Sequence, residues 1–312
     1  MATSRAFALR ICLVLVLLVA VAGCSSQPRR SAQPPARSGA VVVASFNFDE
    51  SRLLAEIYSQ ALAHAGIPVR VELHLGPREL VRPALRQGMV DLVPEYLGTA
   101  TETMDPSVSA EHLPRWRLLA LLRAALAPWR LTALRPAAAV DQNTFAVTRA
   151  TARRHDLRTL SQLAAVAPHL VLGGPSECTQ RALCLPGLRR VYGMHFRDFE
   201  AFDDAAQRQT ALNEGVIDVE LTFSTDGRLA TGTLVPLRDD KGLQPDEAVV
   251  PVVSDRAVAR YGPRLTRALD AVSAALDSAA LRFLNWRVGV AGKDVRAEAH
   301  GWLRRHGLLA QR

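Results

Sequence analysis

The chain has few aromatic residues and almost no lysine. Aromatic side chains make up 5% of its 312 residues, with four tyrosines, and Lys241 and Lys293 are the only lysines. The formal net charge of +8 is therefore carried almost wholly by arginine. No arginine cluster is interleaved with aromatic residues, so the chain lacks the material for stacking on bases. We therefore expect no nucleic-acid partner.

The sequence signatures of common enzyme classes are also missing. The chain has no Gly-x-Ser-x-Gly nucleophile elbow, no His-Glu-x-x-His motif and no glycine loop that could cradle a phosphate. Its eight histidines are scattered, and none is spaced to complete a zinc site with a cysteine. We expect no enzymatic activity, no metal and no cofactor.

The apolar run at the N-terminus is too short to span a bilayer. It extends from Ile11 to Gly23 behind two arginines, which is typical of a signal peptide. It ends in Val-Ala-Gly-Cys at 21–24, which resembles a bacterial lipobox. We expect residues 1–23 to be a lipoprotein signal peptide and Cys24 to carry a lipid anchor on the extracytoplasmic face of the cell membrane. An ordinary secretory signal, cut nearby, is the alternative.

The stretch after the lipobox has no apolar residues to bury. Residues 24–40 are rich in Ser, Pro and Arg, which indicates a flexible tether. Farther along, Cys178 and Cys184 lie six residues apart in a loop that contains Pro and Gly. In an oxidising compartment this spacing favours a disulfide over a metal pair or a reactive thiol.

Two segments, Leu85–Thr99 and Leu212–Thr225, share one pattern. In each, Leu is followed by Gly three residues on, Asp three after that, and an aromatic residue five beyond the Asp. This predicts a helix that ends at a glycine and an apolar strand that delivers Tyr96 or Phe223 past its carboxyl end. Ligands of open α/β sheets sit at the carboxyl ends of strands, so the repeat predicts a two-lobed receptor for a small molecule.

The order of predicted elements supports two α/β lobes. Strands and helices alternate from Val41 onward, which implies open sheets with mostly parallel strands and flanking helices. We expect a first lobe at 41–138, a second at 139–246, and a return to the first lobe with C-terminal helices at 247–312. The two crossings between lobes are expected near 136–143 and 244–250.

Six motifs along the chain resemble motifs of one protein family and occur in the same order. The chain is similar to the substrate-binding proteins of osmoprotectant ABC importers, which are receptors for glycine betaine, choline and carnitine, in SFNFDESRLLAEIY (45–58), PEYLGTA (94–100), LVLGGPSEC (170–178), LPGLRRVYG (185–193), STDGRLA (224–230) and DDKGLQP (239–245). The resemblance implies a periplasmic-binding-protein type II fold with two hinge strands. It also implies permease and ATPase subunits as partners.

The resemblance further implies a ligand cage. Tyr96 matches a cage tyrosine, and Thr99 matches a hydroxyl that helps to hold the ligand. Phe145 and Phe223 stand where many members have tyrosine, and Glu247 falls near the position of a fourth wall. A quaternary ammonium donates no hydrogen bond, so such a receptor must hold it by several aromatic faces.

Of three other matched positions, one departs from the family's residue and two keep it. Phe46 replaces a common lysine, whereas Asn47 is retained, and Arg181 matches an arginine that can pair with a ligand carboxylate. If Glu247 enters the site, it should favour a net cation such as choline over a zwitterion. Because the tyrosine cage is incomplete, a receptor for a neutral or aromatic molecule remains an alternative, and an envelope scaffold lipoprotein is the alternative of a different class.

Overall fold

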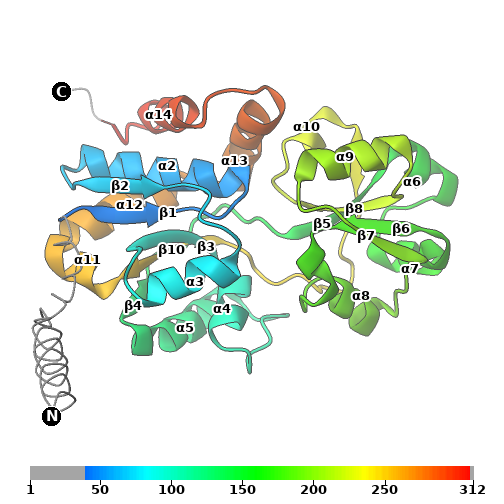
Figure 1. The fold of residues 1–312 in the computed structure, drawn as a ribbon, viewed down its shortest axis with the longest axis horizontal. Helices are drawn as coiled ribbons and strands as arrows, with labels where there is room; N and C mark the ends of the chain where they lie inside the picture. The colour runs from blue at the N-terminus through cyan, green and yellow to red at the C-terminus, as the bar shows by residue number, and fades with distance from the viewer. Residues whose placement is uncertain (1–38, 310–312) are drawn as a thin grey trace, which may run out of the picture. The chain divides into compact units, whose positions relative to one another are not determined.

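The computed structural model describes residues 39–309. From Ala40 onward the chain forms one compact unit that contains two five-stranded sheets (Figure 1). The predicted signal peptide, Cys24 and most of the predicted tether lie outside the described residues. Within residues 39–309, no helix is both long and apolar enough to cross a membrane.

The first sheet has the strand order β2-β1-β3-β10-β4. Its strands are β1 (Val41–Ala44), β2 (Val69–Glu72), β3 (Leu92–Tyr96), β4 (Leu131–Ala133) and β10 (Val249–Ser254). The strand β1 pairs in parallel with β2 and β3, and β10 pairs antiparallel with both β3 and β4. Four strands therefore share one direction, and β10 runs against them.

The second sheet repeats this plan in the order β7-β6-β8-β5-β9. Its strands are β5 (Asn143–Thr148), β6 (Val171–Gly174), β7 (Asp198–Ala201), β8 (Val219–Phe223) and β9 (Leu234–Pro236). Here β5 is the reversed strand, since it pairs antiparallel with β8 and β9 while β6 pairs in parallel with β7 and β8. The predicted two-lobed α/β fold is confirmed, with sheets that are mixed because each holds one reversed strand.

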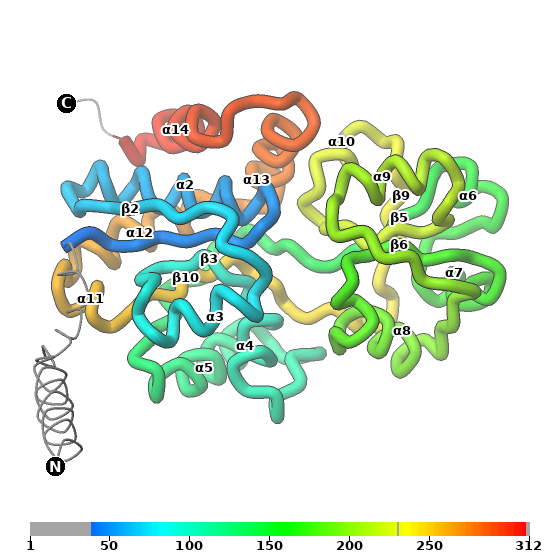
Figure 2. The backbone as a smooth tube through the Cα atoms, in the orientation of Figure 1, coloured from blue at the N-terminus to red at the C-terminus, as the bar shows by residue number. Residues whose placement is uncertain are grey.

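The reversed strand is in each case the first one formed after the chain changes sheets. The chain leaves β4 at Ala133 and enters β5 at Asn143, and it leaves β9 at Pro236 and enters β10 at Val249 (Figure 2). The two crossings touch through an antiparallel bridge between Val140 and Ala248. Both crossings therefore deliver the chain to the edge where β3 and β8 end.

Helices cover the faces of both sheets (Figure 1). Those of the first lobe are α2 (Asp49–His64), α3 (Arg78–Arg86), α4 (Leu97–Met104), α5 (Arg115–Leu126), α11 (Asp255–Tyr261), α12 (Pro263–Ala275), α13 (Ser278–Asn285) and α14 (Val295–Arg305). A π-helical turn, Trp286–Val290, follows α13. Those of the second lobe are α6 (Arg149–His155), α7 (Leu160–Val166), α8 (Leu185–Tyr192), α9 (Ala205–Glu214) and α10 (Arg228–Thr231).

The repeated Gly-Asp pattern has the same structural role in both lobes. Gly88 and Gly215 have φ of 67° and 74°, the left-handed conformation that ends a helix. The Asp91 carboxylate accepts the Val42 N–H at 3.1 Å, and the Asp218 carboxylate accepts the Val171 N–H at 2.9 Å. Each aspartate thus fastens the start of one central strand to its parallel neighbour.

Six of these helices and strands were not predicted from the sequence pattern. They are four short helices, α4, α6, α8 and α10, and two strands at sheet edges, β4 and β7. The helix α4 follows β3 without a turn, because Tyr96 is both the last residue of the strand and the N-cap of the helix. No loop signal separates the two elements, so the strand and the helix read as one segment.

Candidate binding site

Four aromatic rings form a cluster around Phe48, and we call them the aromatic cluster. The Phe48 ring centroid lies 6.0 Å from that of Phe46, 6.2 Å from that of Tyr96 and 5.9 Å from that of Phe223. The rings of Phe46 and Phe223 are inclined to Phe48 by only 12° and 18°. Three of the rings come from the first lobe and Phe223 comes from the second.

The strand ends place these rings together. Phe46 and Phe48 lie on the turn between β1 and α2, Tyr96 ends β3, and Phe223 ends β8. All four residues therefore lie at or just past the carboxyl end of a parallel strand, which is where open α/β sheets bind ligands. Tyr96 and Phe223 also occupy equivalent ends of the two sheets, since Tyr96 pairs with the first residue of β10 and Phe223 with the first residue of β5.

A buried carboxylate, Glu50, joins both lobes beside the aromatic cluster. It accepts a hydrogen bond from the Tyr96 hydroxyl at 2.6 Å, and its other oxygen accepts from the Thr225 hydroxyl and the Asn285 amide. Glu50 is 6% exposed. These donors come from β3, from the loop after β8 and from α13, so one side chain is hydrogen-bonded to three separate parts of the fold.

A second buried acid, Asp141, lies in the first crossing. Its carboxylate accepts the Thr225 N–H at 3.0 Å, and its own N–H donates to the Glu247 carbonyl at 3.0 Å. Thr225 joins the two acids, since its hydroxyl donates to Glu50 and its N–H donates to Asp141. Burial raises the pKa of Glu50, and burial together with the Glu50 charge raises the pKa of Asp141 well above its ordinary value.

The Tyr96 hydroxyl stays protonated in this environment. Burial is the largest cause of its raised pKa, followed by the negative charge of Glu50. The hydroxyl is thus held as a donor to Glu50, which fixes the orientation of the ring.

A buried ion pair borders the aromatic cluster on the side of Phe46. The Arg78 guanidinium donates to the Glu95 carboxylate from Nε at 3.1 Å and from Nη2 at 2.9 Å, and both side chains are nearly buried. The guanidinium carbon lies 4.8 Å from the centroid of the Phe46 ring. Glu95 therefore balances the positive charge of Arg78 at this border.

Glu247 caps the helix that follows Tyr96. Both of its carboxylate oxygens accept the Thr99 N–H at 3.0 Å, and one also accepts the Thr99 hydroxyl. The Gly98 N–H donates to the Asp246 carbonyl and the Leu97 N–H to the Ala248 carbonyl, both at 3.1 Å. The first three N–H groups of α4 are therefore satisfied by the second crossing, which stabilises the helix start electrostatically.

This contact is tight at Gly98. A Cβ atom on Gly98 would lie 2.5 Å from the ring of Pro245, so only glycine allows the crossing to approach α4 so closely. Glu247 itself is 3% exposed, and burial raises its pKa to about 7 in spite of the hydrogen bonds from Thr99. Glu247 and Thr99, both predicted as ligand residues, are thus hydrogen-bonded to each other.

Three of the predicted ligand residues are not part of the aromatic cluster. Phe145 is 1% exposed and packs in the core of the second lobe. Asn47 stands between Phe46 and Phe48, and its side chain is exposed. The Arg181 guanidinium lies 3.4 Å from Glu79 of α3 and 3.1 Å from Glu177, which places it in ion pairs at the rim between the lobes. The structure brings together Phe46, Tyr96 and Phe223, with Thr99 and Glu247 beside them.

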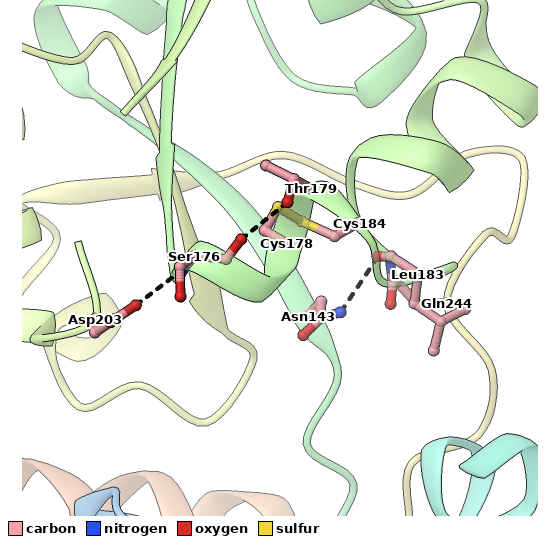
Figure 3. Close-up of a disulfide and its surroundings, with 8 residues drawn as sticks. All are labelled: Asn143, Ser176, Cys178, Thr179, Leu183, Cys184, Asp203 and Gln244. Carbon is pink, nitrogen blue, oxygen red and sulfur yellow. Dashed lines mark hydrogen bonds between the residues drawn. A yellow bond between two sulfur atoms is a disulfide. The ribbon is translucent and has the colours of Figure 1, made fainter. Parts of the chain in front are cut away.

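The disulfide loop holds both crossings on the side of the second lobe. Cys178 and Cys184 form a disulfide between the short helical turn after β6 and the start of α8 (Figure 3). The Leu183 carbonyl inside this loop accepts the Asn143 amide at 3.3 Å and the Gln244 amide at 3.0 Å (Figure 3). One loop therefore bonds to the end of each crossing.

The sequence reasoning did not single out Phe48, Glu50, Asp141 or Arg78. Phe48 and Glu50 lie inside the motif SFNFDES that carried the family resemblance. An acid in the first turn of a helix, however, is the ordinary partner of the helix dipole, so Glu50 gave no separate signal. Asp141 and Arg78 become notable only through contacts with residues remote in sequence.

A surface groove of about 660 Å³ lies farther along α2, between Gln60 and His64 on that helix and Arg296 and His300 of α14. It contains none of the predicted ligand residues. In the part of the chain that the structure describes, no group of three or more His, Cys, Asp or Glu side chains could hold a metal ion.

Residues 39–305 match the family model for the substrate binding domain of ABC-type glycine betaine transport systems. The chain belongs to this family. It is therefore an extracytoplasmic binding component of an ABC importer and not an enzyme.

Named relatives agree with this assignment. The glycine betaine-binding protein YehZ of Escherichia coli is 29% identical over 94% of this chain and 96% of its own length. A glycine-betaine-binding protein of Pseudomonas aeruginosa is 30% identical over 84% of this chain and 86% of its own length. A Helicobacter pylori protein, the ergothioneine transport permease/ergothioneine binding protein EgtU, is 25% identical over 86% of this chain, which spans 48% of that relative.

Solved structures share the fold. The structure of apo YehZ from Escherichia coli covers 87% of this chain and matches over 100% of its own, with a TM-score of 0.66 and 27% identity. The structure of a glycine betaine/carnitine/choline ABC transporter protein has a TM-score of 0.70 at 23% identity, covering 86% of this chain and 99% of its own. The latter supports the fold alone.

Proposed function

We propose that this chain captures a small quaternary ammonium compound and passes it to the permease and ATPase subunits of its ABC importer. The observation that carries the proposal is the aromatic cluster, in which rings from both lobes meet around Phe48. Aromatic faces attract a cation that has no N–H to donate, and each contact contributes about 0.5–2 kcal/mol. The named glycine betaine-binding relatives support the same ligand class.

Among such compounds, the charges beside the aromatic cluster favour a net cation. Glu50 and Glu247 are buried acids, whereas the positive charge of Arg78 is balanced by Glu95. Arg181, which was expected to pair with a ligand carboxylate, lies in ion pairs with Glu79 and Glu177. We therefore expect choline to bind more tightly than the zwitterions glycine betaine and carnitine.

Isothermal titration calorimetry with these three compounds tests the proposal. A neutral isostere of choline, in which carbon replaces the ammonium nitrogen, should bind at least about tenfold more weakly than choline if ring faces hold the charge. Tyr96→Ala should weaken choline binding by a factor of about ten or more, and Trp116→Ala, which changes an exposed ring of α5, serves as the control. Equal binding of the isostere and choline would contradict recognition of the cation.

A flat aromatic ligand is the second candidate. The rings of Phe46 and Phe223 lie nearly parallel to Phe48, and such a stack suits a planar ring system. The relative from Helicobacter pylori named for ergothioneine adds support. The same titrations with aromatic compounds that carry no quaternary ammonium separate the two candidates, because this one requires such a compound to bind more tightly than choline.

We also propose that Cys24 carries a lipid anchor. The Val-Ala-Gly-Cys sequence at 21–24 supports it, and two or more acyl chains would hold the protein firmly to a membrane. Mass spectrometry of the N-terminal peptide should show an acylated Cys24, and Cys24→Ser should move the protein from the membrane fraction to the released fraction. An unmodified N-terminus cut elsewhere would favour the ordinary secretory signal.

A further inference from the structure

We propose that Asp141 holds a proton that it donates to Glu50, and that this shared proton positions Tyr96 and makes ligand capture dependent on pH. The inference deepens the proposed function and rests on it, because the two acids lie beside the aromatic cluster. Asp141 is argued to act through Glu50 and Tyr96, and it is therefore a positioning residue.

The hydrogen bonds that Glu50 accepts decide which of the two acids carries the proton. Its two oxygens already accept from the Tyr96 hydroxyl, the Thr225 hydroxyl and the Asn285 amide. An ionised carboxylate only accepts hydrogen bonds, so Glu50 matches its three donors best in the ionised form. Two buried carboxyl groups that face each other share one proton. That proton therefore belongs on Asp141.

Other charged and titratable side chains surround Glu50 and Asp141. Tyr96 of β3 faces Glu50 as a neutral donor, and the Arg78 charge of α3 is balanced by Glu95. Arg282 of α13 donates to the Ser224 carbonyl, and Glu247 of the second crossing accepts the Asp141 N–H through its carbonyl while its carboxylate binds Thr99. Among the described residues, Arg78 forms its ion pair with Glu95 and Arg282 binds a backbone carbonyl, so neither arginine forms an ion pair with the two acids. The pair is thus stabilised by a proton.

Thr225 connects the proton on Asp141 to movement of the lobes. Thr225 belongs to the second lobe and bonds to both acids, with its hydroxyl on Glu50 and its N–H on Asp141. Asp141 is 5% exposed with these contacts in place and sits in the crossing between the sheets. Separation of the lobes breaks the bond between Thr225 and Glu50 and takes Glu50 away from Asp141, which returns Asp141 to water, where an aspartic acid ionises at neutral pH. Closure over a ligand therefore takes up a proton from the solvent.

The sign of the pH dependence follows. Because the closed form binds the extra proton, ligand affinity should fall as the pH rises through the range between the ordinary pKa of an aspartic acid and the raised pKa of Asp141 in the closed form. In that range the affinity should decrease by up to about tenfold per pH unit. Glu247, whose pKa is raised to about 7, adds its own dependence, which is the same in proteins that differ only at Asp141.

Calorimetric titration of choline from about pH 5 to about pH 8, in buffers of different ionisation enthalpy, tests the linkage. The wild type should take up about one proton more on binding than Asp141→Asn, whose amide donates to Glu50 without a titrating proton. Asp141→Ala should bind more weakly than Asp141→Asn at every pH. Asp218→Asn, which changes an aspartate at the opposite end of β8, should keep the pH profile of the wild type.

Identical proton uptake in the wild type and Asp141→Asn would overturn the inference while leaving ligand binding intact. Infrared difference spectroscopy between the choline-bound and the free protein provides an independent measurement. At neutral pH, binding should add the carbonyl band of a buried protonated carboxylic acid in the wild type but not in Asp141→Asn. The absence of that band in the wild type would overturn the inference, whereas failure of every compound to bind would contradict only the proposed function.

Discussion

The two lobes share a strand order and a repeated aspartate, yet they contribute unequally to the site. The first lobe holds Tyr96 through its hydroxyl to Glu50 and seals the next helix with Glu247. The second lobe presents Phe223, which lies against the Phe48 ring. The first lobe therefore fixes its ring through several buried polar groups, whereas the second lobe contributes the Phe223 ring and one polar residue, Thr225, that bonds to Glu50.

The same inequality appears at the repeated aspartates. Asp91 is 3% exposed and accepts from the Val42 N–H, the Ser254 hydroxyl and Arg256. Asp218 is only half-buried, and the bond that its carboxylate accepts comes from the Val171 N–H. The same sequence pattern therefore places an aspartate with several hydrogen-bond donors in the first lobe and one with a single backbone donor in the second.

Removing the aspartates should give the largest difference between the lobes. Asp91→Ala leaves several buried donors without an acceptor and should lower the free energy of unfolding by about 3 kcal/mol or more. Asp218→Ala loses one bond at a half-buried site and should cost about 1 kcal/mol. Urea denaturation of both variants measures the two values. Equal losses would mean that the repeat is energetically symmetric.

The next effect concerns the buried acid of the second crossing. Burial raises the pKa of Glu247 to about 7, above the value of 4.5 for an exposed glutamate, so the folded protein binds this proton more readily than the unfolded chain. The stability that this proton brings is present below the lower pKa and is lost as the pH rises through the higher one. Relative to Glu247→Gln, the wild type should lose up to about 3 kcal/mol between about pH 5 and about pH 8.

Urea titrations of the wild type and Glu247→Gln at both pH values give this difference directly. The other buried acids are common to the two proteins, so their contributions cancel. Parallel stability profiles for the two proteins would show that the Glu247 carboxyl titrates normally.

The disulfide should affect only the second lobe. Replacing Cys178 and Cys184 by serine opens a short loop and should cost about 2 kcal/mol by the chain-entropy estimate. Hydrogen exchange should become faster in β6 and α8 and stay the same in β1 and β3. Faster exchange in the first sheet would mean that the two lobes unfold as one unit.

The smallest effect is expected at the rim. Arg181 pairs with Glu79 and Glu177 while 38% of its side chain remains exposed, and such pairs contribute less than about 1 kcal/mol. Arg181→Ala should therefore change the affinities for choline and glycine betaine by less than about fivefold. A loss of about tenfold or more for glycine betaine, with choline unaffected, would instead assign Arg181 to the ligand carboxylate.

The sequence predicted the parts of the fold that depend on local pattern. Alternating apolar residues and the helix-ending Gly88 and Gly215 led to most strands and helices, and the repeat placed Tyr96 and Phe223 at strand ends. Phe145 shows the limit. Its place after Asn-Thr resembles a cage position, but on β5 its side chain packs with the core of the second lobe, a choice that depends on which face of the strand helices cover.

The rest of the site could not be predicted because it depends on contacts between distant residues. Glu50 and Thr225 are separated by 175 positions, and Thr99 and Glu247 by 148. Glu247 was expected near the ligand as a wall of the cage, whereas the structure shows it bonded to the start of α4. A single sequence names such residues one at a time and does not say which of them pair.

The close approach of Gly98 and Pro245 bears on where the protein can bend. Because no methyl group fits between them and the first N–H groups of α4 bond to the carbonyls of Asp246 and Ala248, residues 245–248 and α4 should move together as one rigid unit. Rotation of the second lobe is then confined to the few peptide units before Pro245 and to the partner segment around Val140. A pair of spin labels spanning those units would record opening, whereas a pair within 245–248 and α4 would stay at a constant separation.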